Sequence, residues 1–125
     1  MLGCAVHARR KSTIMIYRIA EIADWHAAQL SGEFTGTDLA REGFIHCSTR
    51  GQVLWTAQKY FAGKQGLVLL EIDDARIGES VRCEDLAGQG ESFPHVYAPI
   101  PLATITRHFV LVPDDKGVFS LPPGM

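Results

Sequence analysis

The chain has 125 residues, of which 46% are hydrophobic and 21% are charged, so it is long enough to bury a core as one soluble domain. No stretch approaches the ~20 consecutive apolar residues of a membrane-spanning helix, so no membrane segment is predicted. The net charge is −2, but residues 1–14 carry three basic side chains and no acid, which leaves nine basic against fourteen acidic residues elsewhere. An acidic body argues against DNA binding, because that affinity comes mainly from lysine and arginine at phosphates.

Residues 1–14 lack the apolar run of ~7–15 residues that a signal peptide needs after its charges. Two interpretations remain, a disordered basic arm or a gene start placed too early, with Met15 as the true initiator. We favour the second, which leaves residues 15–125 as a single globular domain. Three cysteines without a close-spaced pair are a poor disulfide framework, so the expected location is the reducing cytoplasm.

The first half of the chain reads as strand, helix, strand, helix. A short β-rich run predicts a strand at Ile16–Ala20, and Asp24 is the expected N-cap of a helix ending near Leu30. A loop follows, with one possible helical turn at Asp38–Arg41. Phe44–Cys47 is the second predicted strand. Ser48 or Thr49 then caps the clearest helix of the sequence, which covers Gln52–Ala62.

The second half reads mainly as strands. Leu67–Ile72 is almost entirely apolar, which predicts a central strand buried on both faces. Further extended segments are expected at Val81–Glu84, Phe93–Ile100 and Ala103–Val112, with a mobile loop at Asp85–Ser92. This order of elements predicts an α+β domain with two helices.

The first candidate for chemistry is the pair His46 and Ser48. Alternate residues of a strand share a face, so both polar groups are expected on one side, just before a helix N-terminus that suits a phosphate. The alternative is that Ser48 only caps the helix and His46 is a hydrogen-bonded core histidine. Cys47 points the other way along the strand, and is therefore interpreted as a small buried hydrophobic residue.

His95 and Tyr97 form a second polar pair, on one face of an extended segment. Tyr97 could stack on a flat ring and His95 could bind a sugar hydroxyl or phosphate, although a rigid edge strand with an inward aromatic explains the pattern equally well. Arg18 lies in the middle of the first strand, where it either enters a polar cleft or stays exposed. Glu84 is a candidate acid or base, against the alternative of a solvated carboxylate. No spacing of cysteine and histidine predicts a metal site.

Four motifs carry a resemblance over about residues 15–112 to the bacterial family called domain of unknown function 952. They are Ile16-Tyr17-Arg18-Ile19, Gly43-Phe44-Ile45-His46-Cys47-Ser48-Thr49 with Gln52, Leu69-Leu70-Glu71-Ile72-Asp73, and Phe93-Pro94-His95-Val96-Tyr97-Ala98-Pro99-Ile100. The chain departs from the family at Ala98, where glycine is usual, and at Arg18, where histidine or lysine is also common.

That family resembles the ADP-ribosyltransferase fold, a split β-sandwich with a cleft for NAD, and within it the RNA 2′-phosphotransferase branch is most similar. The resemblance implies a cofactor site made by Arg18, His46, Ser48, His95 and Tyr97, with NAD as substrate. It assigns catalytic roles to His46 and Ser48. Typical members also use a glutamate near the acceptor, and Glu84 is the candidate here. The basic RNA-binding surface of the phosphotransferases is missing from this acidic chain.

Three functions follow as hypotheses. The first is an NAD-using transferase whose acceptor the sequence does not identify. The second is a non-catalytic module that binds a nucleotide or another small ligand in the same cleft. The third is a structural or interaction protein whose polar face is only a packed network, which the two polar pairs on otherwise apolar strands disfavour.

Overall fold

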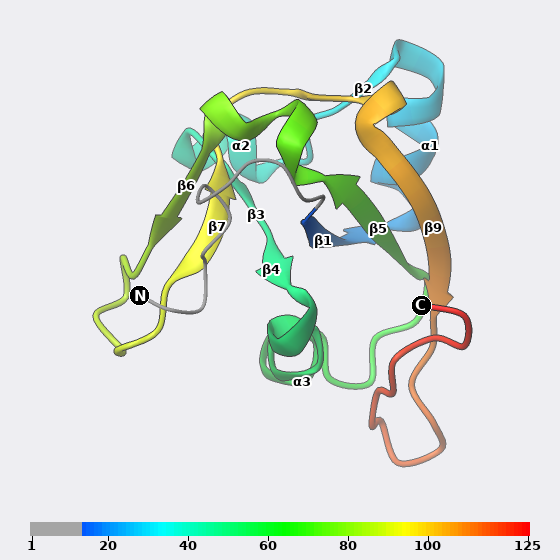
Figure 1. Cartoon of the computed structure of the whole chain (residues 1–125). Helices are drawn as coiled ribbons and strands as arrows, with labels where there is room; N and C mark the ends of the chain where they lie inside the picture. The colour runs from blue at the N-terminus through cyan, green and yellow to red at the C-terminus, as the bar shows by residue number, and fades with distance from the viewer. Residues whose placement is uncertain (1–13) are drawn as a thin grey trace.

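A four-stranded antiparallel sheet, in the order β4-β1-β5-β9, runs through the middle of the molecule (Figure 1). The computed structural model describes residues 14–125, so the predictions about the N-terminal extension fall outside the described residues, apart from position 14. The strands of this sheet are β1 (Met15–Glu21), β4 (Ser48–Thr49), β5 (Leu67–Asp73) and β9 (Ile105–Leu111).

Strand β5 is buried on both faces, which confirms the prediction from its apolar sequence. Val68, Leu70 and Ile72 point into one hydrophobic cluster, while Leu67 and Leu69 point into another on the opposite face. Because successive side chains of a strand alternate between faces, a strand with a core on each side needs this continuous apolar run.

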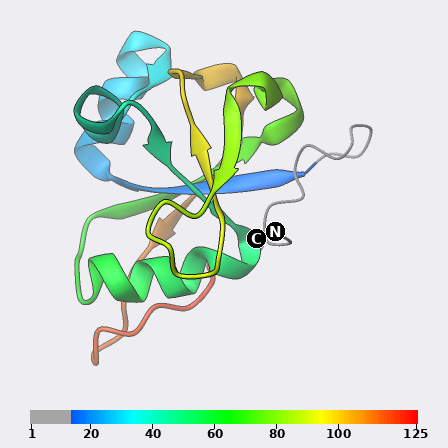
Figure 2. The same ribbon diagram turned by 90° about the vertical axis from the view of Figure 1, so that its left-hand side faces the viewer.

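A second antiparallel sheet, in the order β3-β7-β6, covers one face of the first. Its strands are β3 (Ile45–His46), β6 (Val81–Glu84) and β7 (Phe93–Val96), and a small pair joins β2 (Glu33–Phe34) to β8 (Ile100–Pro101). Figure 2 shows these strands on one side of β1 and the third helix on the other side. The two hydrophobic clusters therefore fill the two layers on either side of the four-stranded sheet.

The chain passes from one sheet to the other within five residues. Ile45 and His46 pair with β7, whereas Ser48 and Thr49 pair with β1. Cys47 lies between them, and its backbone N–H donates to the carbonyl of Pro94 over 3.0 Å. The predicted strand Phe44–Cys47 is thus two short strands in different sheets, a corner of the kind found where sheets diverge.

Residues 14–125 contain three α-helices, so the prediction of two was wrong. They are α1 (Ile22–Ser31), α2 (Asp38–Glu42) and α3 (Val53–Phe61), and short 3₁₀ turns occur at Arg50–Gln52, Asp74–Arg76, Gly78–Ser80 and Leu102–Thr104. The additional helix is α2, which the sequence indicated only as one possible turn. No helix within residues 14–125 has the length and apolar character needed to cross a membrane.

Helix α1 begins two residues before Asp24, with Glu21 in the N-cap position. The backbone N–H of Ile22 donates to the carbonyl of Gly66 over 2.9 Å, and this contact with a distant loop fixes the start of the helix. At the other end Gly32 takes a φ of 95° and its N–H donates to Ala28, which is a common helix termination. With its antiparallel sheets and three helices, the described part of the chain is a small α+β domain.

Candidate functional site

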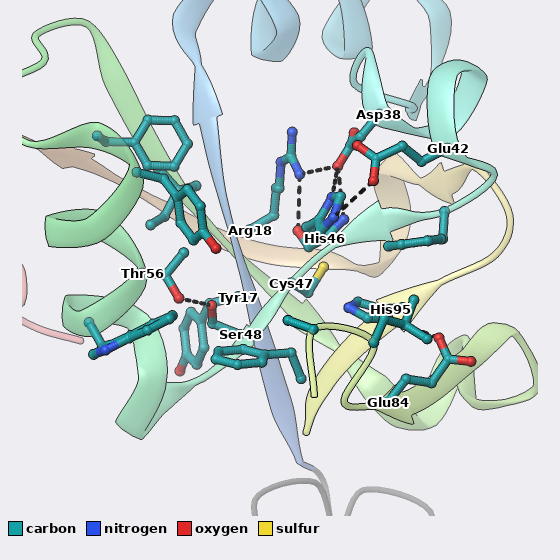
Figure 3. A pocket seen from close by; sticks show the side chains of 18 of the residues that line it. Tyr17, Arg18, Asp38, Glu42, His46, Cys47, Ser48, Thr56, Glu84 and His95 are labelled. Atoms are coloured by element: carbon teal, nitrogen blue, oxygen red, sulfur yellow. Dashed lines mark hydrogen bonds and ion pairs between the residues drawn. The ribbon is translucent and has the colours of Figure 1, made fainter. Parts of the chain in front are cut away.

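A cleft opens along the edge of β1 where its neighbour β4 stops. Strand β4 pairs only with Ile16 and Tyr17, so among the described residues no strand covers the Arg18–Glu21 part of this edge. The cleft has a volume of about 1070 Å³. It lies between α2 and the β3-β7-β6 sheet on one side and α3 on the other (Figure 3). A concave site of this size at a junction of sheets is where small ligands usually bind.

Carboxylates and aromatic rings dominate the lining of this cleft. Seven of its residues are acidic and two are arginines: Glu21, Asp24, Asp38, Glu42, Glu84, Asp85 and Glu91, with Arg18 and Arg41. Its aromatic residues besides histidine are Tyr17, Phe44, Trp55, Tyr60, Phe61 and Phe93. The ion pairs within the lining neutralise only part of this charge, so the cleft carries an excess of negative charge.

Arg18, Asp38 and His46 form a connected network at one end of the cleft. Nη1 of Arg18 lies 2.6 Å from Oδ2 of Asp38 and also donates to the His46 carbonyl over 3.0 Å. The same Oδ2 accepts the backbone N–H of His46 and lies 2.9 Å from its ring Nδ1. Nε2 of the ring faces Glu42 at 3.4 Å. The His46 ring is thereby held between two carboxylates, with 48% of its side chain exposed.

Asp38 is the centre of this network, with a side chain only 5% exposed. Burial alone would raise its pKa, but the hydrogen bonds from His46 and the charge of Arg18 outweigh burial and hold the pKa well below the usual range. Asp38 is therefore ionised and can only accept hydrogen bonds. It follows that Nδ1 of His46 carries the proton in their bond.

Gly36 makes the close approach of Arg18 and Asp38 possible. Its φ is 62°, in the left-handed region, and a Cβ placed there would come within 2.6 Å of Oδ1 of Asp38 and 3.2 Å of Nη2 of Arg18. Any larger residue would therefore push against the ion pair as well as strain the backbone.

Ser48 lies on the opposite wall from this network. Its Oγ is 3.0 Å from Oγ1 of Thr56 on α3, and the residue is buried. Thr49 caps the 3₁₀ turn Arg50–Gln52 that leads into α3, and its backbone N–H donates to the Gln52 side chain over 3.0 Å. Neither Ser48 nor Thr49 is thus the N-cap of α3 itself, which is Gln52, and Ser48 lines the cleft.

Glu84 holds His95 and Tyr97 together in the second sheet. Its Oε1 lies 2.8 Å from Nδ1 of His95 and accepts the Tyr97 hydroxyl over 2.6 Å. Burial acts to raise the pKa of Glu84, and the bonds from Tyr97 and His95 lower it below the usual value. Glu84 is therefore ionised, so Nδ1 of His95 donates to it. Burial lowers the pKa of His95, although Glu84 opposes that effect.

Phe44 packs the two histidines into one aromatic group. Its ring centroid lies 4.7 Å from that of His46, 4.3 Å from that of His95 and 5.3 Å from that of Tyr97. Phe44 and His46 therefore share a face of their segment, and Ser48, the expected partner of His46, lines the same cleft from its other wall. Because His95 and Tyr97 bond the same oxygen of Glu84, they also lie on one side of their segment.

Cys47 is a buried side chain in the hydrophobic cluster between the sheets, as predicted. Burial raises the pKa of its thiol to about 12, so the group stays protonated and unreactive at neutral pH. Within the described residues Cys47 forms no disulfide.

Of the six predicted site residues, all except Tyr97 line the same cleft: Arg18, His46, Ser48, Glu84 and His95. Tyr97 does not line it, and the Arg82 guanidinium lies over its ring at 5.0 Å. Arg18 enters the polar cleft and is not exposed, which decides between the two alternatives for it.

Among the described residues no group of three or more histidine, cysteine or acidic side chains is suited to a metal ion.

Sequence reasoning missed Asp38 and Glu42, which orient His46. A signal did exist for Asp38, because an arginine in the middle of a buried strand needs a carboxylate partner. The sequence did not indicate which acidic residue would supply it, since twenty positions separate the two.

Comparisons with known proteins agree with the family motifs. A family model described as "Protein of unknown function (DUF952)" matches residues 19–108. The crystal structure of protein CC0527 from Caulobacter crescentus is 39% identical, with a TM-score of 0.76 over 86% of this chain and 94% of that one. The solution NMR structure of CC0527 is 40% identical, with a TM-score of 0.71 over 83% of this chain and 90% of that one.

A comparison with curated proteins gives no match. The family model nevertheless covers most of the chain, and CC0527 is similar over nearly its whole length. The chain therefore belongs to the family described as "Protein of unknown function (DUF952)".

Proposed function

We propose that the cleft binds NAD and that the protein is an ADP-ribosyltransferase-like transferase. The observation that carries this proposal is the corner at Cys47, which brings Arg18, His46 and Ser48 to one cleft from two diverging sheets. A split β-sandwich with a cleft for NAD would need such a corner. By the resemblance, Arg18 would lie on the first strand of the cleft, and His46 and Ser48 would contact the ribose or the nicotinamide. All three residues line this cleft, which supports the proposal.

The electrostatics of the cleft favour the nicotinamide–ribose end of NAD. The nicotinamide ring is a planar cation, and carboxylates and aromatic faces are the groups that attract such a ring. When the bond between this ring and ribose breaks, positive charge passes to the ribosyl carbon. The excess of carboxylates would stabilise that charge.

The phosphates of NAD require a different part of the site. Arg41 on α2 is the more accessible guanidinium of the lining, because 67% of its side chain is exposed and its pair with Glu42 at 3.3 Å is a surface contact. The guanidinium of Arg18 is instead held by the buried Asp38. We therefore place the pyrophosphate beside Arg41. We therefore expect Arg41→Gln to weaken the binding of NAD. Nicotinamide riboside, which lacks phosphates, should bind the wild type and the variant with equal affinity.

Calorimetric titration of NAD tests the proposal. Wild-type protein should bind NAD saturably, and His46→Ala should lower the affinity at least tenfold because it removes a side chain that the bound ribose or nicotinamide would contact. His26→Ala is the matched control, since His26 is an exposed histidine of α1 outside the cleft. A folded wild-type protein that does not bind NAD would disprove the proposal.

A second candidate is a non-catalytic module that binds a nucleotide or similar small ligand. The specific observation in its favour is that Glu84, the expected catalytic glutamate, is already bonded to His95 and Tyr97. Saturable NAD binding without release of nicotinamide would select this alternative. For either function we propose a cytoplasmic location and a soluble ligand, with no role for DNA or a membrane.

A further inference from the structure

We infer that His95, oriented by Glu84, is the general base that deprotonates the acceptor, and that the acceptor is therefore a hydroxyl group or water. This inference rests on the proposed function, and it gives Glu84 a positioning role in place of direct contact with substrate. The ADP-ribosyl group would then pass to an oxygen nucleophile whose proton has to be removed. An acceptor that is already ionised, such as a carboxylate, would need no base.

The geometry singles out His95 over the other histidine of the cleft. Both rings donate Nδ1–H to a carboxylate, His46 to Asp38 and His95 to Glu84. Nε2 of His46, however, faces Glu42 at 3.4 Å. Within residues 14–125, Nε2 of His95 has no hydrogen-bond partner. A bare Nε2 on a ring that lines the cleft is the atom that can take a proton from a substrate.

The surroundings of His95 hold the ring in place. Only 7% of its side chain is exposed, and the Phe44 ring packs against it at a centroid distance of 4.3 Å. Figure 3 shows His95 and Glu84 on the same wall of the cleft as His46, whose ring centroid lies 5.6 Å from that of His95. A carboxylate that bonds a buried imidazole in this way keeps the ring in one tautomer and one orientation, as in enzymes that activate hydroxyl nucleophiles.

The proposed step is balanced in atoms and charge. The acceptor oxygen bonds to the ribosyl carbon as the bond from that carbon to the ring nitrogen breaks, and the electron pair leaves with nicotinamide, which becomes neutral. The acceptor proton passes to Nε2 of His95, and the imidazolium that forms is balanced by the Glu84 carboxylate. Release of this proton to solvent restores the enzyme.

The charged and titratable groups that face His95 set its pH response. They are Glu84 and Arg82 on β6, Tyr97 beyond β7, His46 on β3 and Glu42 on α2. Burial keeps the pKa of His95 below its usual value, so the base form persists at neutral and mildly acidic pH. Nicotinamide release should fall as the pH drops through this pKa.

The test compares wild type with His95→Gln, whose amide can still donate to Glu84. NAD affinity should change less than about threefold, and nicotinamide release should fall at least about a hundredfold, the usual contribution of a general base. With methanol present, wild type should form the methyl glycoside of ADP-ribose as well as ADP-ribose.

Glu84→Gln should lower the rate and move the acid limb of the pH profile to lower pH, because Glu84 raises the pKa of His95. The exposed Glu79→Gln is the matched control.

Two results would overturn the assignment of His95 as the base while leaving NAD binding intact. One is equal nicotinamide release by wild type and His95→Gln, and the other is NAD binding by the wild type with no release of nicotinamide. Loss of NAD binding by the wild type removes the proposed function and this inference with it. If His95→Gln does not fold, ¹⁵N NMR of the wild-type imidazole decides. A proton on Nδ1 with Nε2 bare supports the assignment, and a proton on Nε2 overturns it.

Discussion

Arg18 and Asp38 form an ion pair with 2.6 Å between Nη1 and Oδ2, at the point where the two sheets diverge. The pair joins the middle of β1 to the start of α2, and Asp38 in turn holds His46. Positioning of the His46 ring therefore depends on a buried contact between segments that are distant in sequence.

Asp38→Asn should destabilise the protein by about 3–5 kcal/mol, because it leaves the charge of Arg18 in a buried site without its counter-charge. Urea unfolding followed by circular dichroism measures this change. The control is Arg41→Gln, which breaks an exposed pair with Glu42 and should cost no more than about 1 kcal/mol. Equal losses of unfolding free energy in the two variants would show that the buried ion pair stabilises the protein no more than the exposed pair does.

The sequence predicted most of the strands, because each carries a recognisable apolar pattern. The central strand β5 and the opposite faces of His46 and Cys47 followed directly from alternation along a strand. The break at Cys47 could not be predicted, since β3 and β4 have two residues each and are defined by their partners.

The candidate site could be predicted only in part, because local patterns show the face of a residue and not its partner. Residues on alternating strand positions could be assigned to a face, and five of the six reach the cleft. What decides their chemistry is long-range pairing: Arg18 with Asp38, and Glu84 with both His95 and Tyr97. Such partners are fixed by the packing of whole elements, which no local pattern reveals.

Gly36→Ala should be more disruptive than Gly43→Ala. Both glycines have positive φ, so both substitutions carry a backbone strain of about 1–2 kcal/mol. Only at Gly36 would the new Cβ meet the Arg18–Asp38 pair, whereas the space beside Gly43 is open. The difference in unfolding free energy between the two variants measures this contact, and a value near zero would contradict the close approach.

Glu71 should make stability depend on acidic pH. It accepts hydrogen bonds from Arg107, Thr106 and Tyr17, and the bond from Arg107 is the main cause that lowers its pKa to about 2. Because the folded pKa is below the unfolded value, this stabilisation is complete above about pH 4.5 and is lost as the pH falls toward 2.

Glu71→Gln removes the titrating group and should cost about 1.5–3 kcal/mol at neutral pH, since bonds to a charged acceptor are lost. Its unfolding free energy should also fall less steeply than that of wild type below pH 4.5. The exposed Glu79→Gln should keep the wild-type slope. Parallel profiles for wild type and Glu71→Gln would refute the lowered pKa.

Cys47 should resist alkylation in the folded protein. Its thiol is buried and its pKa is raised to about 12, so little thiolate forms at pH 8. Iodoacetamide labelling followed by peptide mass spectrometry should find Cys47 unmodified under native conditions and fully modified in urea. Cys83 is the internal comparison, because it is only partly buried. Rapid native labelling of Cys47 would contradict its assignment to the core.

The most direct test of the central claim, that the cleft binds NAD, is a titration of ¹⁵N-labelled protein with NAD followed by amide chemical shifts. The account predicts saturating shifts in the strands and helices that form the cleft, at Arg18, Asp38, His46 and Ser48, with nicotinamide riboside moving the same amides. Residues of β9, on the far edge of the four-stranded sheet, should stay unchanged. No saturating shifts, or shifts confined to β9 and the C-terminal segment, would contradict it.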